Sequence, residues 1–321
     1  LKGGVLKHDM KTLISGSMAF DSIMVFEDHF KNHILPDQIH ILNVSFFVPT
    51  MKRHNGGCAG NIAYTLKLLG GDPLIMATVG EDFGSYQSWL DEQSISSEHV
   101  TTVKDTFTAQ AFITTDLGNN QINAFHPGAM SHAHMNKVGD AKGVELGIVA
   151  PNGPEAMLEH AQQFAEANIP FIFDPGQAMP LFDGPALLKF VEQARWLIVN
   201  DYESQMLTEK TGVDIDTLAG MVDCLIVTKG AQGSVVYTNN ETLEVPAATI
   251  SEAVDPTGCG DAYRSGVLYG LSKGYDWARC AKIGGLCGAI KVESEGTQSH
   301  RFTLEQFAER YAATYNEKMD A

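Results

Sequence analysis

Short apolar runs alternate with helical patterns along most of the 321-residue chain. Runs of this kind are typical of strands buried on both faces of a sheet. The predicted strands are 12–18, 74–79, 144–150, 170–174, 196–200 and 225–228. Residues 157, 161, 164 and 168 have helical spacing, and 186–194 forms a second helical segment. Strands that alternate with helices predict an α/β fold with three layers, α/β/α, around a mainly parallel central sheet.

Two segments depart from this pattern. Residues 41–51 and 107–125 are rich in threonine and aromatic residues, and the second contains the turn Leu117–Gly118–Asn119–Asn120. These features favour antiparallel strands. We therefore expect a small β-stranded appendage, made from discontinuous segments at about 21–52 and 105–128.

Length and composition fit one such domain, which we expect to span residues 10–318. We expect residues 1–9, which precede Met10, to lie outside the natural chain, and they are left out of the fold prediction. The 22 basic and 39 acidic residues give a net charge of −17, which argues against nucleic acid or an anionic membrane as partner. Five cysteines without C-x-x-C spacing indicate free thiols in a reducing cytoplasm. No apolar run approaches the roughly 18 residues of a membrane span.

The run Asp255–Asp261, with sequence DPTGCGD, opens an apolar helical segment. Gly258 and Gly260 carry no side chain, so their backbone N–H groups can approach an anion, which the helix dipole also attracts. A carboxylate repels phosphate. Asp261 therefore fits the role of a base that accepts a proton from an attacking hydroxyl. The alternative is a plain helix N-terminus with an acidic first turn.

A second glycine pair, Gly56–Gly57, precedes Asn61, Ile62 and Leu66, which again have helical spacing. The amide of Asn61 can both donate and accept, so it suits a ligand hydroxyl better than a phosphate. Taken alone, such a pair is also a common tight connection.

Other phosphate and metal motifs are absent from the sequence. There is no G-x-x-x-x-G-K-[ST], so a P-loop is excluded. Residues 14–19, ISGSMA, lack the G-x-G-x-x-G of a dinucleotide-binding dehydrogenase. His132 and His134 could share one strand face, but no nearby residue completes a zinc set, and exposed histidines are ordinary after a Pro–Gly turn.

The two glycine motifs together resemble the two signatures of the ribokinase-like (PfkB) carbohydrate and nucleoside kinases, and the resemblance covers nearly the whole chain. Asn200–Glu203 is similar to the family's N-x-x-E, and Thr228–Gly233 to its T-x-G-x-x-G nucleotide loop. Cys259 departs from the alanine of many relatives. Residues 35–40, 44–48 and 125–130 resemble the bacterial adenosine kinases rather than ribokinase or fructokinase.

The resemblance implies an ATP-dependent transfer of phosphate to the 5′-hydroxyl of adenosine, giving AMP. The β-stranded appendage is implied to be a lid over the substrate. Residues implied in catalysis are Asp261 as the base, with Gly258, Cys259 and Gly260 as the anion site. Residues implied in nucleoside binding are Ser17, Asp21, Ser45, Phe46, Gly56, Gly57, Asn61 and Phe125. Residues implied in nucleotide binding are Asn200, Thr228, Gly230, Gly233, Gly288, Gly296 and Gln298.

Glu203 is implied to act on Mg²⁺ through water, and a monovalent cation such as K⁺ is implied near Asp255. We expect no partner beyond nucleoside and ATP, and a monomer or homodimer. Three alternatives stay open: a kinase for a free sugar such as ribose or fructose, a kinase for another nucleoside such as guanosine, and a binding protein that has lost its chemistry. Asn200–Glu203 could also be a helix cap alone.

Aromatic side chains are the candidates for contact with the purine base. Phe46 and Phe125 are candidates to stack on a purine, because a flat aromatic face suits a flat base, but packing in the core is an equal alternative. Where a close relative would offer an aromatic side chain, this chain has Ala111, and Phe112 beside it should face the other way.

Overall fold

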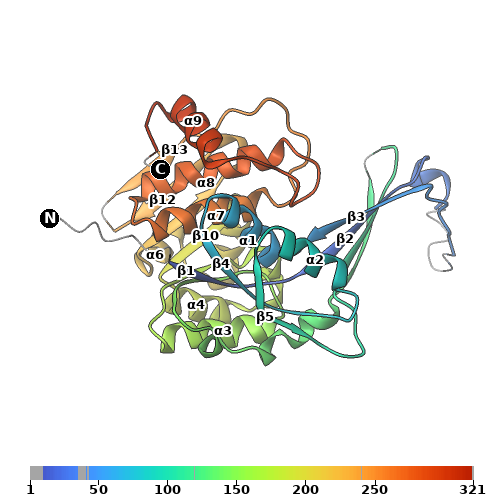
Figure 1. Ribbon diagram of the computed structural model, residues 1–321, viewed down its shortest axis with the longest axis horizontal. Coiled ribbons are helices and arrows are strands. Elements are labelled where there is room, and N and C mark those ends of the chain that lie inside the picture. Colours follow the sequence, from blue (N-terminus) through green and yellow to red (C-terminus); the bar gives the residue numbers. More distant parts are fainter. Residues whose placement is uncertain (1–9, 35–40, 42, 119, 240, 320–321) are drawn as a thin grey trace.

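A computed structural model describes residues 10–34, 41, 43–118, 120–239 and 241–319 (Figure 1). Nine strands of this part of the chain form one sheet, in the order β13-β12-β11-β10-β9-β8-β1-β4-β5. Their bounds are β1 Lys11–Ser15, β4 Asp72–Val79, β5 Ser96–Thr102, β8 Val144–Val149, β9 Phe171–Phe173, β10 Trp196–Asn200, β11 Cys224–Thr228, β12 Ser234–Thr238 and β13 Thr242–Val245. The run from β11 to β5 is parallel, and β12 and β13 are antiparallel additions.

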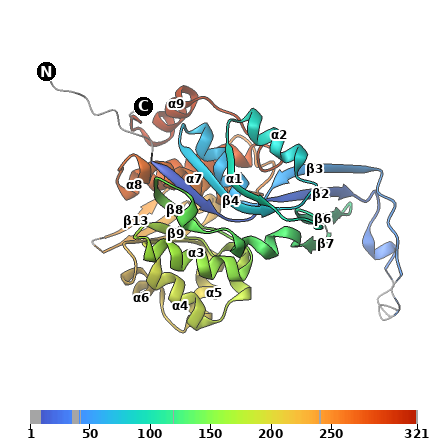
Figure 2. The same ribbon diagram turned by 60° about the horizontal axis from the view of Figure 1, so that its bottom comes forward.

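Helices cover both faces of this sheet (Figure 2). One face carries α1 Cys58–Leu68, α2 Gly84–Glu92, α7 Cys259–Ser272, α8 Trp277–Val292 and α9 Leu304–Tyr315. The other carries α3 Pro154–Glu166, α4 Gly184–Gln193, α5 Asp201–Thr211 and α6 Ile215–Gly220. The three-layer α/β/α fold predicted from the alternating pattern is therefore confirmed.

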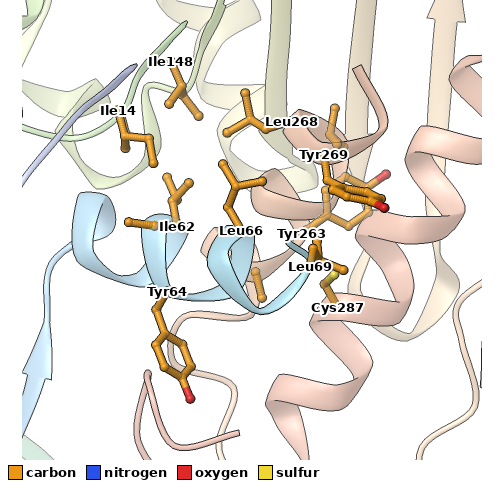
Figure 3. Close-up of a cluster of buried hydrophobic side chains, with 14 of the residues drawn as sticks. Ile14, Ile62, Tyr64, Leu66, Leu69, Ile148, Tyr263, Leu268, Tyr269 and Cys287 are labelled. Carbon is orange, nitrogen blue, oxygen red and sulfur yellow. The ribbon is translucent and has the colours of Figure 1, made fainter. Parts of the chain in front are cut away.

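Alternating strand residues supply two cores. Leu13 and Leu197 pack into the core under α3 to α6, whereas their neighbours Ile14 and Ile198 pack into the core under α1, α7 and α8. This division explains the continuous apolar runs, because a strand covered on both faces has no polar side. Figure 3 shows the second core, where Ile62 of α1 points toward Ile14 and Ile148 of the sheet.

A second sheet of four described strands projects from the body (Figure 1). We call it the lid; its order is β3-β2-β6-β7, with bounds β2 Ala19–Val25, β3 Thr50–Gly56, β6 Ala109–Thr115 and β7 Gln121–His126. β6 and β7 are antiparallel, as predicted for 107–125, whereas β2 and β6 run parallel. Every residue of β7 is exposed, in contrast to the central strands of the large sheet.

The prediction of a strand over 41–51 was largely wrong. Residues 43–48 have no regular secondary structure, and β3 begins only at Thr50. The Phe46 ring lies 4.9 Å from that of Phe26 and 5.0 Å from that of Phe30, between ring centroids, so side-chain packing determines the path of this segment. Residues 35–40, used for the resemblance, lie outside the described residues, as do 1–9.

The predicted strand 12–18 ends early, at Ser15, because the chain leaves the large sheet there and enters the lid at Ala19. The helix expected through residue 168 ends at Glu166, and Asn168 adopts a left-handed conformation with φ 53°. Among the described helices, none is both long enough and apolar enough to cross a membrane.

Candidate active site

Two helix N-termini meet beyond the carboxyl ends of the parallel strands. α7 is capped by Gly258 with φ +79°, and α1 by Gly57 with φ +85°. A Cβ atom at Gly57 would lie 2.5 Å from the Ser17 backbone oxygen, so only glycine fits there. Asn61 of α1 donates from Nδ2 to Asp261 Oδ2 of α7 at 2.8 Å. The two motifs, 200 residues apart in sequence, are thus joined by one hydrogen bond.

Asp261 lies in the first turn of α7. Burial raises the pKa of its carboxyl group, and the Asn61 hydrogen bond and the nearby Arg264 guanidinium oppose that rise. A carboxylate whose pKa is raised accepts a proton more readily. Cys259 donates its N–H to Pro256 O at 3.2 Å, so within the turn the Gly258 and Gly260 amides are the better placed to receive an anion.

A cavity of about 1310 Å³ opens at this junction. Sites for a single drug-sized ligand usually span roughly 300–1,000 Å³, so there is room for two ligands side by side. The predicted site residues that line it are Ser17, Asp21, Gly57, Asn61, Phe125, Asn200, Glu203, Thr228, Gly230, Gly233, Gly258, Cys259, Gly260, Asp261 and Gly288. Several of them, including Ser17 after β1, Asn200 at the end of β10 and Thr228 at the end of β11, lie at the carboxyl ends of parallel strands, which is where open α/β sheets bind ligands.

One row of lid residues faces the cavity. Asp21 of β2 pairs with Ala111 of β6, and Ala111 pairs with Phe125 of β7. Paired residues share a face of a sheet, and all three line the cavity. Burial raises the pKa of Asp21 to about 6, although the nearby His54 lowers it. The predicted opposite orientation of Phe112 agrees with its absence from the cavity lining.

Two residues expected at the nucleoside do not line the cavity. Ser45 is exposed, and Phe46 packs in the aromatic cluster with Phe26 and Phe30. That cluster belongs to the connection between β2 and β3, and neither residue contacts the cavity. Their assignment to the nucleoside is not supported by this arrangement and stays a prediction.

Three further predicted site residues contact residues of the site without lining the cavity. A Cβ at Gly56 would lie 2.4 Å from Asp21 Oδ2, so this glycine makes room for the carboxylate. Gln298, expected at the nucleotide, instead donates from Nε2 to Asn61 Oδ1 at 3.0 Å and orients that amide. Gly296, also expected there, donates its N–H to Asp255 Oδ2 at 2.8 Å. None of these three residues lines the cavity in this structure, and their assignment to nucleoside or nucleotide binding stays a prediction.

Both residues proposed for the magnesium side lie at the junction of β10 and α5. Asn200 and Glu203 form a capping box on α5: the Asn200 side chain accepts from Glu203 N at 2.7 Å, and Glu203 Oε2 accepts from Asn200 N at 2.8 Å. The helix-cap alternative is thus present, but both residues also line the cavity. Mg²⁺ usually keeps several waters and takes one or two carboxylates besides phosphate oxygens, so Glu203 alone fits such an ion.

Sequence reasoning missed a buried ion pair close to Glu203. Arg264 Nη2 donates to Asp174 Oδ1 at 2.6 Å and lies 3.8 Å from Glu203 Oε2. Burial raises the pKa of Asp174 to about 7, although Arg264 lowers it. The positions of the two residues in the sequence could have indicated this pair, because Asp174 directly follows β9 and Arg264 lies one helical turn after Asp261.

His132 and His134 lie in a 3-10 helix, Gly128–Met135, rather than on a strand, and His134 Nδ1 lies 3.3 Å from Glu155 Oε2. The described residues contain no cluster of three His, Cys, Asp or Glu side chains that could hold a metal ion.

Comparison with known proteins gives a consistent result. Residues 22–303 match the pfkB family carbohydrate kinase model. The chain is 34% identical to a nucleoside kinase of Methanocaldococcus jannaschii over 270 residues, 84% of this chain and 89% of the relative. It is 45% identical to the nucleoside kinase of Burkholderia thailandensis, solved in complex with inosine, with a TM-score of 0.88 over 97% of this chain and 100% of that one.

These matches confirm the family resemblance, the fold class with its small lid sheet, and the class of enzyme. The narrower resemblance to bacterial adenosine kinases stays a prediction. On a match of this extent, the chain belongs to the pfkB family of carbohydrate kinases, phosphotransferases that act on a hydroxyl group.

Proposed function

We propose that this chain transfers a phosphoryl group from ATP to the 5′-hydroxyl of a ribonucleoside, with adenosine as the acceptor. The observation that carries the proposal is the 2.8 Å contact between Asn61 and Asp261, at the junction of two helix N-termini, inside a cavity with room for two ligands. The nucleoside kinases among the relatives support the acceptor class.

On the acceptor side, Asp21 and Asn61 would bind the ribose hydroxyls, with Ser17 and Gly57 beside them. Asp261 would accept the proton of the 5′-hydroxyl as that oxygen attacks phosphorus. Gln298 holds Asn61, and Asn61 holds Asp261, so the base is already oriented before substrate binds. Phe125, on the lid face above Asp21, would stack on the base.

On the nucleotide side, the Gly258 and Gly260 amides would hold the transferring phosphate at the positive end of the α7 dipole. Burial raises the pKa of the Cys259 thiol to about 11, so this side chain stays neutral beside the phosphate. Thr228, Gly230, Gly233 and Gly288 would line the rest of the nucleotide. Bound Mg²⁺, reached by Glu203 through water, would neutralise phosphate charge.

The test is a panel of acceptors with ATP and Mg²⁺: adenosine, inosine, guanosine, ribose and fructose. We expect AMP and ADP in equal amounts from adenosine and its kcat/KM to be the highest of the panel, with 5′-deoxyadenosine as a control that gives no product. A higher kcat/KM for inosine than for adenosine would change the preferred purine base, and the chain would still be a nucleoside kinase. Phosphorylation of ribose but of no nucleoside would overturn the proposal, and binding without ADP formation would favour the binding-protein alternative.

A further inference from the structure

Lys291, near the C-terminus of α8, has a side chain with no solvent exposure. Its Nζ donates to the backbone oxygen of Asp255 at 2.8 Å and to that of Ser294 at 3.1 Å, and it lies 3.7 Å from Asp255 Oδ2. An ammonium group has three hydrogens to donate. Burying a charged group is costly unless such partners surround it. The oxygen atoms around Lys291 Nζ therefore form a site that suits a cation.

The segment that this ammonium holds leads directly into the phosphate-binding turn. Asp255 Oδ1 accepts from Thr257 N at 2.9 Å, and Oδ2 accepts from Gly296 N at 2.8 Å. The backbone N–H of Asp255 donates to Val292 O at 3.0 Å. Lys291 and its neighbours therefore tie the end of α8 to the residues that set the position of Gly258.

The same oxygen atoms are of the kind that binds K⁺, which prefers backbone carbonyls. An ammonium ion carries the same single charge as K⁺ and is similar in size. Because Nζ already lies among these oxygens, the monovalent cation expected near Asp255 does not fit there. The position of Nζ therefore argues against that expectation.

We propose that Lys291 is a positioning residue whose tethered ammonium takes the place of a monovalent metal ion beside the phosphate-binding turn. This rests on the proposed kinase function. It follows that the enzyme works without K⁺, and that removal of the amine creates a requirement for a free cation.

The test compares the wild type with two variants in choline, sodium, potassium and ammonium chloride at equal ionic strength, with ATP as its Tris salt. Wild-type kcat/KM is expected to differ by less than about twofold among the salts. Lys291→Ala is expected to lose about tenfold or more in choline chloride and to recover most of it in potassium or ammonium chloride. Lys291→Met fills the space and is expected to show the loss without recovery. Lys189→Ala, at an exposed lysine of α4, is the matched control.

Thermal unfolding in the same salts provides a readout that needs no catalysis. Potassium chloride should raise the Tm of Lys291→Ala above its value in choline chloride and leave the wild-type and Lys291→Met values unchanged. Strong activation of the wild type by K⁺ would overturn the inference, as would a Lys291→Ala variant that gains neither activity nor stability from K⁺. If no salt supports nucleoside phosphorylation, the proposed function fails, and the Tm comparison still decides the role of Lys291.

Discussion

The two sheets of this protein are built differently and contribute different parts of the site. The central strands of the large sheet are buried on both faces, as in β10, whereas β7 of the lid is exposed along its whole length. The proposed base, Asp261, and the proposed phosphate site come from helices packed on the large sheet. The lid supplies Asp21 and Phe125 from one face of a single layer.

Because of this difference, we expect the body and the lid to affect different kinetic parameters. Asp261 is held by Asn61 and indirectly by Gln298, in contacts that belong to the packed body. Strands β3 and β7 of the lid are largely exposed, so we expect the lid to adjust more readily to the acceptor. We therefore expect body substitutions to change kcat or stability, and lid substitutions to change the KM for the nucleoside.

The largest effect is expected for Asp261→Asn. The amide cannot accept the hydroxyl proton, so kcat should fall by about 10³- to 10⁴-fold while the far-ultraviolet circular dichroism spectrum is unchanged. Steady-state kinetics with saturating nucleoside measure this. Glu305→Gln, at an exposed acid in the first turn of α9, is the control and should keep wild-type turnover. A variant at Asp261 with near-normal kcat would remove this residue as the base.

A pair of truncations compares the stability of the two sheets. Leu197→Ala in β10 removes a fully buried side chain and should lower the free energy of unfolding by about 2–5 kcal/mol. Ile122→Ala in β7, whose side chain is 42% exposed, should lower it by less than about 0.5 kcal/mol. Urea unfolding followed by fluorescence gives both values. Equal losses would contradict the contrast between body and lid.

Asp21→Asn tests the polar contact of the lid. Loss of an ionised acceptor for the ribose hydroxyls should raise the nucleoside KM by about ten- to a hundredfold and change kcat little. Because the pKa of Asp21 is raised to about 6, the wild-type KM should also rise as the pH falls through 6, and the variant should lack that dependence. Initial rates between pH 5 and 8, with separate titration of ATP, provide the measurement. A pH dependence retained in the variant would assign it to another group.

Ionisation of the Asp21 carboxyl group should also lower the free energy of unfolding at neutral pH. The pKa of this carboxyl group is about 6 in the folded chain and 3.8 ordinarily, so folding favours its protonated form. The stability gained from the protonated form is complete below pH 3.8 and is lost as the pH rises through 6. Asp21→Asn should therefore be more stable than the wild type at pH 8 by about 1–2 kcal/mol, and the gap should close at pH 4. A stability difference of the opposite sign at pH 8 would show that the ionised form is favoured by folding.

The smallest effect is expected from Phe125→Ala. Loss of stacking should raise the nucleoside KM by about three- to tenfold. Phe112→Ala, on the opposite face of the lid, should leave it unchanged. Equal changes in the two variants would mean that the lid acts through its overall order and not through a contact with the base.

Sequence patterns predicted the local features well. The bounds of β10 were exact, and both glycine turns open helices where expected, because strand burial and helix initiation depend on neighbouring residues. The aromatic packing of Phe46 was not predictable in the same way. The segment has strand-like composition, and its ring contacts with Phe26 and Phe30 override that preference.

The amino-acid sequence alone determined the layered α/β architecture and the two glycine turns that open α1 and α7. Three contacts became visible only in the folded chain: Gln298 on Asn61, Arg264 on Asp174 and Lys291 on Asp255. Their partners lie 237, 90 and 36 residues apart. Side chains at such separations meet only when strand order and helix packing bring their backbones together, and no local periodicity encodes that distance.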